Sequence, residues 1–217
     1  MEHSRWLEAW ENGNIGFHIS EYHPLLVKYY ESLKLEENSK ILIPLSGKTL
    51  DILFFAKRAH NVVAVELSEL AVQSFFEENH IPYEVKQNKH AKKYVSKDPK
   101  LNIEIYCDDL FNLEEADFDL IYDRASIVAL PPEIRIEYRS FLQDKIKNAG
   151  QWFIISFEYV QEKMDGPPFS VPFNEIKSNT TKLEWKELES QTRKPSERFQ
   201  ANGLDIFSQS AYLGKKI

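Results

Sequence analysis

Two apolar runs decide the fold: Lys40-Ile41-Leu42-Ile43-Pro44-Leu45 and Val62-Val63-Ala64-Val65-Glu66. The segment between them, residues 49–60, spaces its apolar residues as an amphipathic helix does. The second run is apolar at consecutive positions, which is typical of a strand buried on both faces. A strand, a helix and a second strand in this order predict a parallel sheet built from strand-helix-strand units.

The same alternation continues along the rest of the chain. The pattern predicts, after residue 66, a helix capped by Ser68, strands at 103–106, 118–122 and 151–157, a helix from Pro131 to Gly150, and a terminal antiparallel hairpin built from 183–188 and 204–213. The polar, Lys-rich stretch from Lys86 to Lys100 is interpreted as a solvated connection. No break in composition marks a second domain, so we expect one domain over residues 1–217, with a lid and helix at 1–35 and an α/β core at 40–217.

Composition excludes several classes of protein. Of the 217 residues, 42% are hydrophobic, which is typical of a globular chain with a full core. The 27 Lys and Arg against 34 Asp and Glu give a net charge of −7, which argues against a nucleic-acid partner. A single cysteine, Cys107, excludes an internal disulfide framework and is typical of a reducing compartment. The start lacks a signal-peptide pattern, and no stretch approaches the ~20 apolar residues of a membrane span, so we expect a cytoplasmic protein with no membrane partner.

In open parallel sheets, ligands bind beyond the carboxyl ends of the strands. Leu45 and Glu66 stand at two such ends, 21 residues apart. An acidic residue at the end of the second strand is suited to a nucleoside ribose, because a carboxylate accepts hydrogen bonds from both hydroxyls. The loop from Leu45 to Thr49 has one glycine and matches neither a dinucleotide fingerprint nor a phosphate-binding loop. A solvated acid at a strand end is therefore the alternative for Glu66.

Other charged residues also follow predicted strands. Asp108-Asp109 and Asp123-Arg124 are either structural ion pairs between strand ends or parts of a site. The six His show no metal-ligand spacing, so we expect no metal site.

Trp6 and Trp10 are four residues apart near the start of the chain and therefore share one face of a short helix. With Phe17 they form either a helix docked on the core or a lid that covers a ligand and excludes water.

Six segments together resemble the thiopurine S-methyltransferase family over nearly the whole chain. They are Trp6-x-x-x-Trp10 with Ile15-Gly16-Phe17-His18, the loop Pro44 to Asp51, Val62 to Glu69, Tyr122-Asp123-Arg124-Ala125, Ala129-Leu130-Pro131-Pro132, and Gly166 to Val171. The resemblance implies a Rossmann-like class I methyltransferase with seven mostly parallel strands in the order 3-2-1-4-5-7-6, helices on both faces and an N-terminal lid.

The resemblance also implies the cofactor and the residues that bind it. The cofactor is S-adenosylmethionine, with S-adenosylhomocysteine as product, and the implied contacts are Trp6, Trp10, Phe17, Leu45, Glu66, Asp109, Leu110 and Arg124. The family loop usually reads Leu-Cys-Gly-Lys, whereas this chain has Ser46 at the cysteine position. Asp109 stands where family members carry varied residues. Arg124 and Arg198 are the candidates to position an anionic acceptor, with a plain surface cation as the alternative for Arg198.

The implied activity is methyl transfer to the sulfur of a thiopurine or another aromatic or heterocyclic thiol by a monomeric enzyme. A dry site favours this in-line displacement, because the positive sulfonium and the negative thiolate neutralise each other. Heteroaromatic thiols are largely ionised near neutral pH, so alignment of the two reactants matters more than a strong base. Halide, thiocyanate and selenium or tellurium species are alternative acceptors, and a non-catalytic S-adenosylmethionine-binding module is a second alternative.

Two substitutions follow from this interpretation. Glu66→Gln is expected to weaken cofactor binding while leaving stability almost unchanged. Trp10→Ala is expected to weaken cofactor binding while leaving the fold intact.

Overall fold

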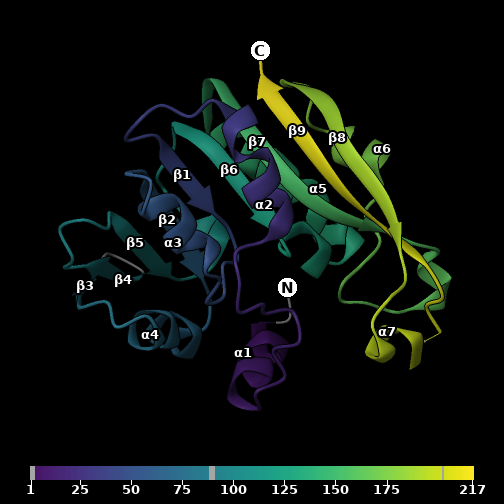
Figure 1. Ribbon diagram of the computed structural model, residues 1–217, viewed down its shortest axis with the longest axis horizontal. Coiled ribbons are helices and arrows are strands. Elements are labelled where there is room, and N and C mark those ends of the chain that lie inside the picture. The colour runs from purple at the N-terminus through teal and green to yellow at the C-terminus, as the bar shows by residue number, and fades with distance from the viewer. Residues whose placement is uncertain (1–2, 88–90, 202) are drawn as a thin grey trace. The chain divides into compact units, whose positions relative to one another are not determined.

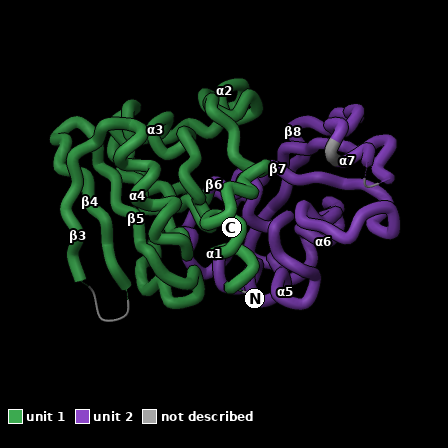
Figure 2. The backbone as a smooth tube through the Cα atoms, turned by 90° about the horizontal axis from the view of Figure 1, so that it is seen from below, with its two compact units in different colours: residues 1–121 green, residues 122–217 purple. Residues whose placement is uncertain are grey.

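The computed structural model describes residues 3–87, 91–201 and 203–217. The chain divides into two compact units, residues 1–121 and residues 122–217 (Figure 2). Among the described residues, no helix combines the length and the apolar character that crossing a bilayer requires.

Unit 1 contains most of the parallel sheet (Figure 1). Its elements are α1 (His3–Glu11), α2 (Pro24–Tyr29), the 3-10 helix η1 (Tyr30–Leu33), β1 (Lys40–Ile43), α3 (Asp51–Ala56), β2 (Asn61–Glu66), α4 (Glu69–Glu78), β3 (Tyr83–Gln87), β4 (Lys92–Ser96), β5 (Ile103–Cys107), the 3-10 helix η2 (Leu110–Asn112) and the first part of β6 (Phe118–Arg124). Strand β1 pairs in parallel with β2 and β6, and β2 pairs in parallel with β5.

The sequence explains the centre of unit 1. Five of the six residues of β2 are buried, as its continuous apolar run predicts. The prediction that Ser68 caps the next helix is confirmed, because its side chain accepts a hydrogen bond from the backbone N–H of Ala71 at the start of α4.

Unit 2 begins at the end of β6. Its elements are the 3-10 helix η3 (Ile127–Ala129), α5 (Pro132–Lys145), β7 (Ile146–Glu158), the 3-10 helix η4 (Gln161–Lys163), α6 (Phe173–Lys177), β8 (Leu183–Arg193), α7 (Glu197–Ala201) and β9 (Phe207–Lys216). Strand β9 is antiparallel to both β7 and β8, which confirms the predicted terminal hairpin. Helix α5 packs on β7, with the rings of Tyr138 and Trp152 6.2 Å apart between centroids.

In the described part of the chain the sheet has nine strands, in the order β3-β4-β5-β2-β1-β6-β7-β9-β8, so the expected number of seven is wrong. Without β3 and β4, the remaining order is the predicted 3-2-1-4-5-7-6. The two extra strands form an antiparallel hairpin that pairs with β5. Part of the stretch from Lys86 to Lys100 is therefore a strand rather than a solvated connection. The prediction was wrong because the lysines of this stretch make its pattern polar. The ring of Tyr94, 1% exposed, nevertheless places β4 against the core.

The boundary between α5 and β7 also differs from the prediction. The helix ends at Lys145 instead of Gly150, and β7 starts at Ile146. Ile146 is buried and begins the strand, but the three residues after it are exposed. Because these three residues interrupt the apolar pattern, the sequence does not show that the strand starts at Ile146. Gly150 is a buried residue of the strand and not a helix stop.

Candidate functional site

The loop after β1 has a backbone conformation that is rare for residues with a side chain. Leu45 has a φ of +46° and Gly47 a φ of +53°, so both lie in the left-handed region. Glycine adopts this region easily, whereas another residue incurs roughly 1–2 kcal/mol. The backbone N–H of Ser46 donates to the carbonyl of Val65 over 3.0 Å and ties the loop to β2. The backbone is therefore strained at Leu45, which the family resemblance implies as a cofactor contact.

Glu66 is buried at the end of β2, and both of its carboxylate oxygens accept backbone hydrogen bonds. The N–H of Gly47 donates to Oε2 over 2.7 Å, and the N–H of Ser68 donates to Oε1 over 2.8 Å. Burial raises the pKa of the Glu66 carboxyl, and these N–H groups oppose that shift. Glu66 is therefore no solvated strand-end acid: it joins the loop after β1 to the loop after β2.

The carboxylate of Glu66 retains acceptor capacity. A carboxylate offers about four lone-pair positions. The N–H groups of Gly47 and Ser68 use two of them, and the N–H of Leu67 also favours the charged carboxyl. The remaining positions suit the two adjacent hydroxyls of a ribose. The donor and acceptor chemistry at the end of β2 therefore fits the nucleoside part of S-adenosylmethionine.

The predicted aromatic cluster forms over the loop after β1. Helix α1 places Trp6 and Trp10 against the ring of Phe17, with centroids 5.7 and 5.6 Å apart in edge-to-face geometry. A β-carbon on Gly47 would lie 3.0 Å from Cζ2 of Trp10, a tight contact, so a larger residue here would require the indole to move by a few tenths of an ångström. Trp10, 7% exposed, thus packs on the loop that Glu66 holds.

The loop after β5 also contacts helix α1. Nε2 of His3 lies 2.9 Å from Oδ2 of Asp109, while Oδ1 of Asp109 accepts the backbone N–H of Phe111 over 3.0 Å at the start of η2. Leu110, 1% exposed, follows directly. Helix α1 therefore contacts the loops after β1 and β5, and the carboxylate of Asp109 is engaged by α1 and η2.

The predicted cofactor residues of unit 1 therefore lie in one connected group, which is linked by direct contacts and by contacts of residues close to them in the sequence. They are Trp6, Trp10, Phe17, Leu45, Glu66, Asp109 and Leu110. Among the described residues there is no cluster of three His, Cys, Asp or Glu side chains that could hold a metal ion.

Arg124 ends β6 in unit 2 and is half-buried. The next residue, Ala125, has a φ of +61°, so the chain turns sharply there. The preceding Asp123 is fully buried, and its carboxylate accepts the N–H of Ile127 over 3.0 Å and the hydroxyl of Tyr138 over 2.8 Å. These partners are neutral, so the structural ion-pair alternative does not describe Asp123.

Arg198 belongs to α7, but its side chain lies outside the described residues, so its expected role stays a prediction.

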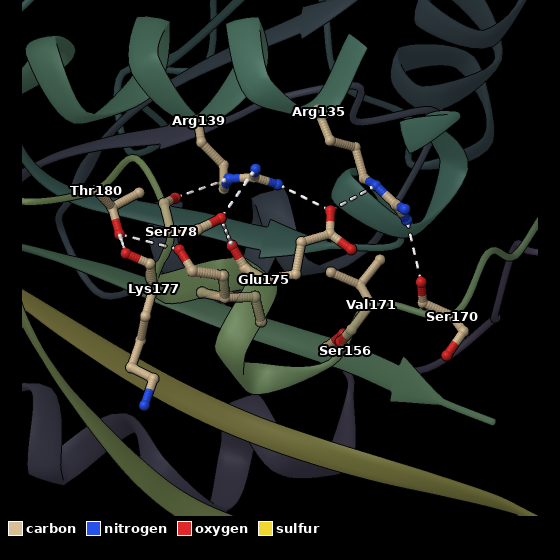
Figure 3. Close-up of polar contacts among 10 residues, drawn as sticks. Arg135, Arg139, Ser156, Ser170, Val171, Glu175, Lys177, Ser178 and Thr180 are labelled. Carbon is tan, nitrogen blue, oxygen red and sulfur yellow. Dashed lines mark hydrogen bonds and ion pairs between the residues drawn. The ribbon is translucent and has the colours of Figure 1, made fainter. Parts of the chain in front are cut away.

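Sequence reasoning missed a buried charge cluster that includes two arginines of α5 (Figure 3). Arg135 and Arg139, 3% and 2% exposed, share the carboxylate of Glu175 at 2.8 and 2.9 Å. Arg135 also donates to the carbonyl of Ser170 over 3.1 Å, and Arg139 to that of Ser178 over 3.2 Å. The cluster holds α6 and the chain on both sides of it against α5.

The spacing of the two arginines was the available signal for this cluster, because residues four apart share a helix face. Their partners are 35 to 39 residues away, beyond the reach of a local pattern.

Comparisons with known proteins point to one family. The family model described as Thiopurine S-methyltransferase (TPMT) matches residues 1–216. A thiopurine S-methyltransferase of Nitrosomonas eutropha is 40% identical, with 100% of this chain and 99% of the relative covered. One of Aliivibrio fischeri is 35% identical, with 98% and 99% covered.

Among solved structures, the fold resembles a 1,6-didemethyltoxoflavin-N1-methyltransferase of Burkholderia thailandensis with bound S-adenosylhomocysteine. The TM-score is 0.64 at 15% identity, and 99% of this chain and 86% of that chain are covered. This likeness shows the fold of an S-adenosylmethionine-dependent methyltransferase.

Proposed function

The chain belongs to the thiopurine S-methyltransferase family and is an S-adenosylmethionine-dependent S-methyltransferase, and from this premise we propose that its acceptor is a thiopurine or another aromatic or heterocyclic thiol. The match to relatives of that name over the full chain carries the proposal. Family membership also removes the alternative of a non-catalytic binding module.

In the proposed site, Glu66 accepts the ribose hydroxyls of S-adenosylmethionine. Its support is the buried carboxylate with unused acceptor positions beside the strained loop of Leu45 and Gly47. Leu110 and the backbone at Asp109 are proposed to line the adenine, because the Asp109 carboxylate already binds His3 and Phe111.

Trp6, Trp10 and Phe17 are proposed to act as the lid. Their rings pack together on α1 and the segment after it, and Trp10 contacts the loop at Gly47. When bound, S-adenosylmethionine supplies a methyl group on a positively charged sulfur. The aromatic rings exclude water there, and the resulting low polarity favours the neutralisation of charge in the transfer.

Arg124 is proposed to orient the acceptor, and Arg198 is a second candidate. A guanidinium is permanently charged and has five N–H donors, which suits an anionic thiolate or a water bound to it. The main work of these residues is to hold the acceptor in line, and proximity of this kind supplies several kcal/mol in enzymes.

We further infer that the enzyme acts as a monomeric single-domain protein in the cytoplasm. The one cysteine, Cys107, is free, as in proteins of reducing compartments. Light scattering of the purified protein, together with fractionation of cells that express it, tests this inference.

An acceptor panel tests the proposed function. Thiopurines, aryl thiols, iodide, thiocyanate and selenite are each assayed for methyl transfer from labelled S-adenosylmethionine. We expect the thiols to give the highest kcat/KM. Preferential methylation of iodide, thiocyanate or selenite would replace the thiol with that acceptor while leaving the methyltransferase assignment in place.

A further inference from the structure

The turn that presents Arg124 is built around a buried acid. Asp123 is 0% exposed and stands directly before Arg124 at the end of β6. Its Oδ1 accepts the N–H of Ile127, so the carboxylate closes the chain from 123 to 127. This segment includes Ala125 in the left-handed region, a conformation that persists only when surrounding contacts impose it.

Several donors converge on this one carboxylate. The hydroxyl of Tyr138, on α5, donates to Oδ2 over 2.8 Å. The indole N–H of Trp152, on β7, and the backbone N–H of Ser126 also favour the charged carboxyl, although the indole nitrogen makes no well-formed hydrogen bond. Four donors therefore face this carboxyl group, and they offset part of the cost that burial imposes on its charged form.

The ionisation of Asp123 falls in an accessible range of pH. Burial raises the pKa of the Asp123 carboxyl to about 6, and the N–H of Ile127 and the hydroxyl of Tyr138 oppose the shift. Tyr138 remains protonated, because burial and the neighbouring carboxylate raise its pKa well above the usual value. Tyr138 is the titratable side chain that faces Asp123 from α5. At neutral pH the turn is therefore held by an ionised Asp123.

We propose that Asp123 is a positioning residue, which fixes the turn after β6 and thereby holds the guanidinium of Arg124 in place for an anionic acceptor. The proposal rests on the proposed role of Arg124. Asp123 itself touches neither acceptor nor cofactor in this account, because its oxygens are buried and bonded within unit 2.

Asp123→Asn is the first test, because asparagine keeps the shape but presents an N–H₂ donor where Tyr138 donates. The acceptor KM is expected to rise roughly threefold to tenfold, the equivalent of one ordinary hydrogen bond, with kcat and cofactor affinity nearly unchanged. The acceptor is an electron-poor aryl thiol that stays ionised across roughly pH 5–8, with iodide as a second permanent anion.

The pH profile separates positioning from a general loss of structure. In the parent protein, acceptor kcat/KM should fall as the pH drops through about 6, and Asp123→Asn should lack this acidic limb. Tyr138→Phe removes one donor to the carboxylate and should move the limb to higher pH. Tyr212→Phe removes another buried hydroxyl of unit 2, away from Asp123, and should leave the limb in place.

A double variant tests whether Asp123 acts through Arg124. Once Arg124→Ala has raised KM, adding Asp123→Asn should raise it no further, because the two residues act as one unit. Additive effects, a normal KM in either single variant, or an acidic limb that persists in Asp123→Asn would overturn the proposal.

Acceptor affinity is also measured by calorimetry with S-adenosylhomocysteine present, so the test does not depend on turnover. If no thiol is methylated, the proposed acceptor class fails, while the calorimetric comparison with iodide still decides the role of Asp123.

Discussion

The backbone N–H of Gly47 donates a 2.7 Å hydrogen bond to Oε2 of Glu66 and so links the loop after β1 to the end of β2. The same carboxylate binds Ser68 through its other oxygen, and Trp10 lies against Gly47. One buried acid thus organises the two loops and the surface against which the ring of Trp10 packs. A change at Glu66 is therefore expected to affect the fold as well as the proposed cofactor site.

Glu66→Gln should weaken S-adenosylmethionine binding about ten- to a hundredfold, because the ribose loses a charged acceptor. The structure changes the expectation for stability. A glutamine directs its N–H₂ at either Gly47 or Ser68, and the unpaired backbone donor should lower the free energy of unfolding by about 1–3 kcal/mol. Calorimetric titration and denaturant unfolding measure the two effects.

Glu78→Gln is the control for Glu66→Gln, because Glu78 pairs with Lys48 at the surface of the same unit. It should change stability by less than about 1 kcal/mol. Normal cofactor affinity in Glu66→Gln would remove the ribose assignment, and an unchanged unfolding curve would show that the two backbone bonds contribute little.

Trp10→Ala should reduce cofactor affinity more than it reduces stability. Trp10 is nearly buried, yet it packs on Phe17 and Gly47 from α1, outside the sheet. Trp152→Ala in the middle of β7 is the comparison and should lose about 3–5 kcal/mol of unfolding free energy, as core tryptophans do. Equal losses in the two variants, with cofactor affinity retained in Trp10→Ala, would make Trp10 a packing residue only.

The central strands of unit 1 could be predicted because their signals are local. The run at 62–66 and the capping Ser68 each lie within a few neighbouring residues. Strand β4 was missed because its lysines mask a single deeply buried ring, that of Tyr94. A period-two pattern with one apolar anchor is too weak to separate an outer strand from a loop.

The charge clusters of unit 2 could not be predicted for a different reason. The partners of Arg135 and Arg139 follow from how α6 packs on α5, and the hydroxyl that binds Asp123 comes from Tyr138, 15 residues away. The motif around Asp123 indicated an important position. Only the tertiary contacts show that its carboxylate closes the turn.

Glu175→Gln should destabilise the protein, because the two buried guanidinium groups would lose the carboxylate that they share. Breaking a buried ion pair by removing one partner typically costs about 3–5 kcal/mol, and the partial exposure of Glu175 places the expected loss near the lower figure, about 3 kcal/mol. Asp144→Asn breaks the exposed pair with Lys182 and should cost less than about 1 kcal/mol. Similar unfolding midpoints for both variants would contradict this expectation.

The stability of the parent protein relative to Asp123→Asn should fall as the pH rises from about 4 to about 7. Burial raises the pKa of Asp123 from 3.8 to about 6 in the folded protein. In that interval the folded state holds a proton that the unfolded state has released, so the contribution of Asp123 is fully present below 3.8 and is lost as the pH rises through 6. A shift of this size corresponds to ~3 kcal/mol.

Denaturant unfolding of both proteins at a series of pH values gives the difference directly, because the other titrating groups are common to both. A difference between parent and Asp123→Asn that stays constant, or that grows with pH, would mean that the ionised carboxylate of Asp123 carries no stability cost.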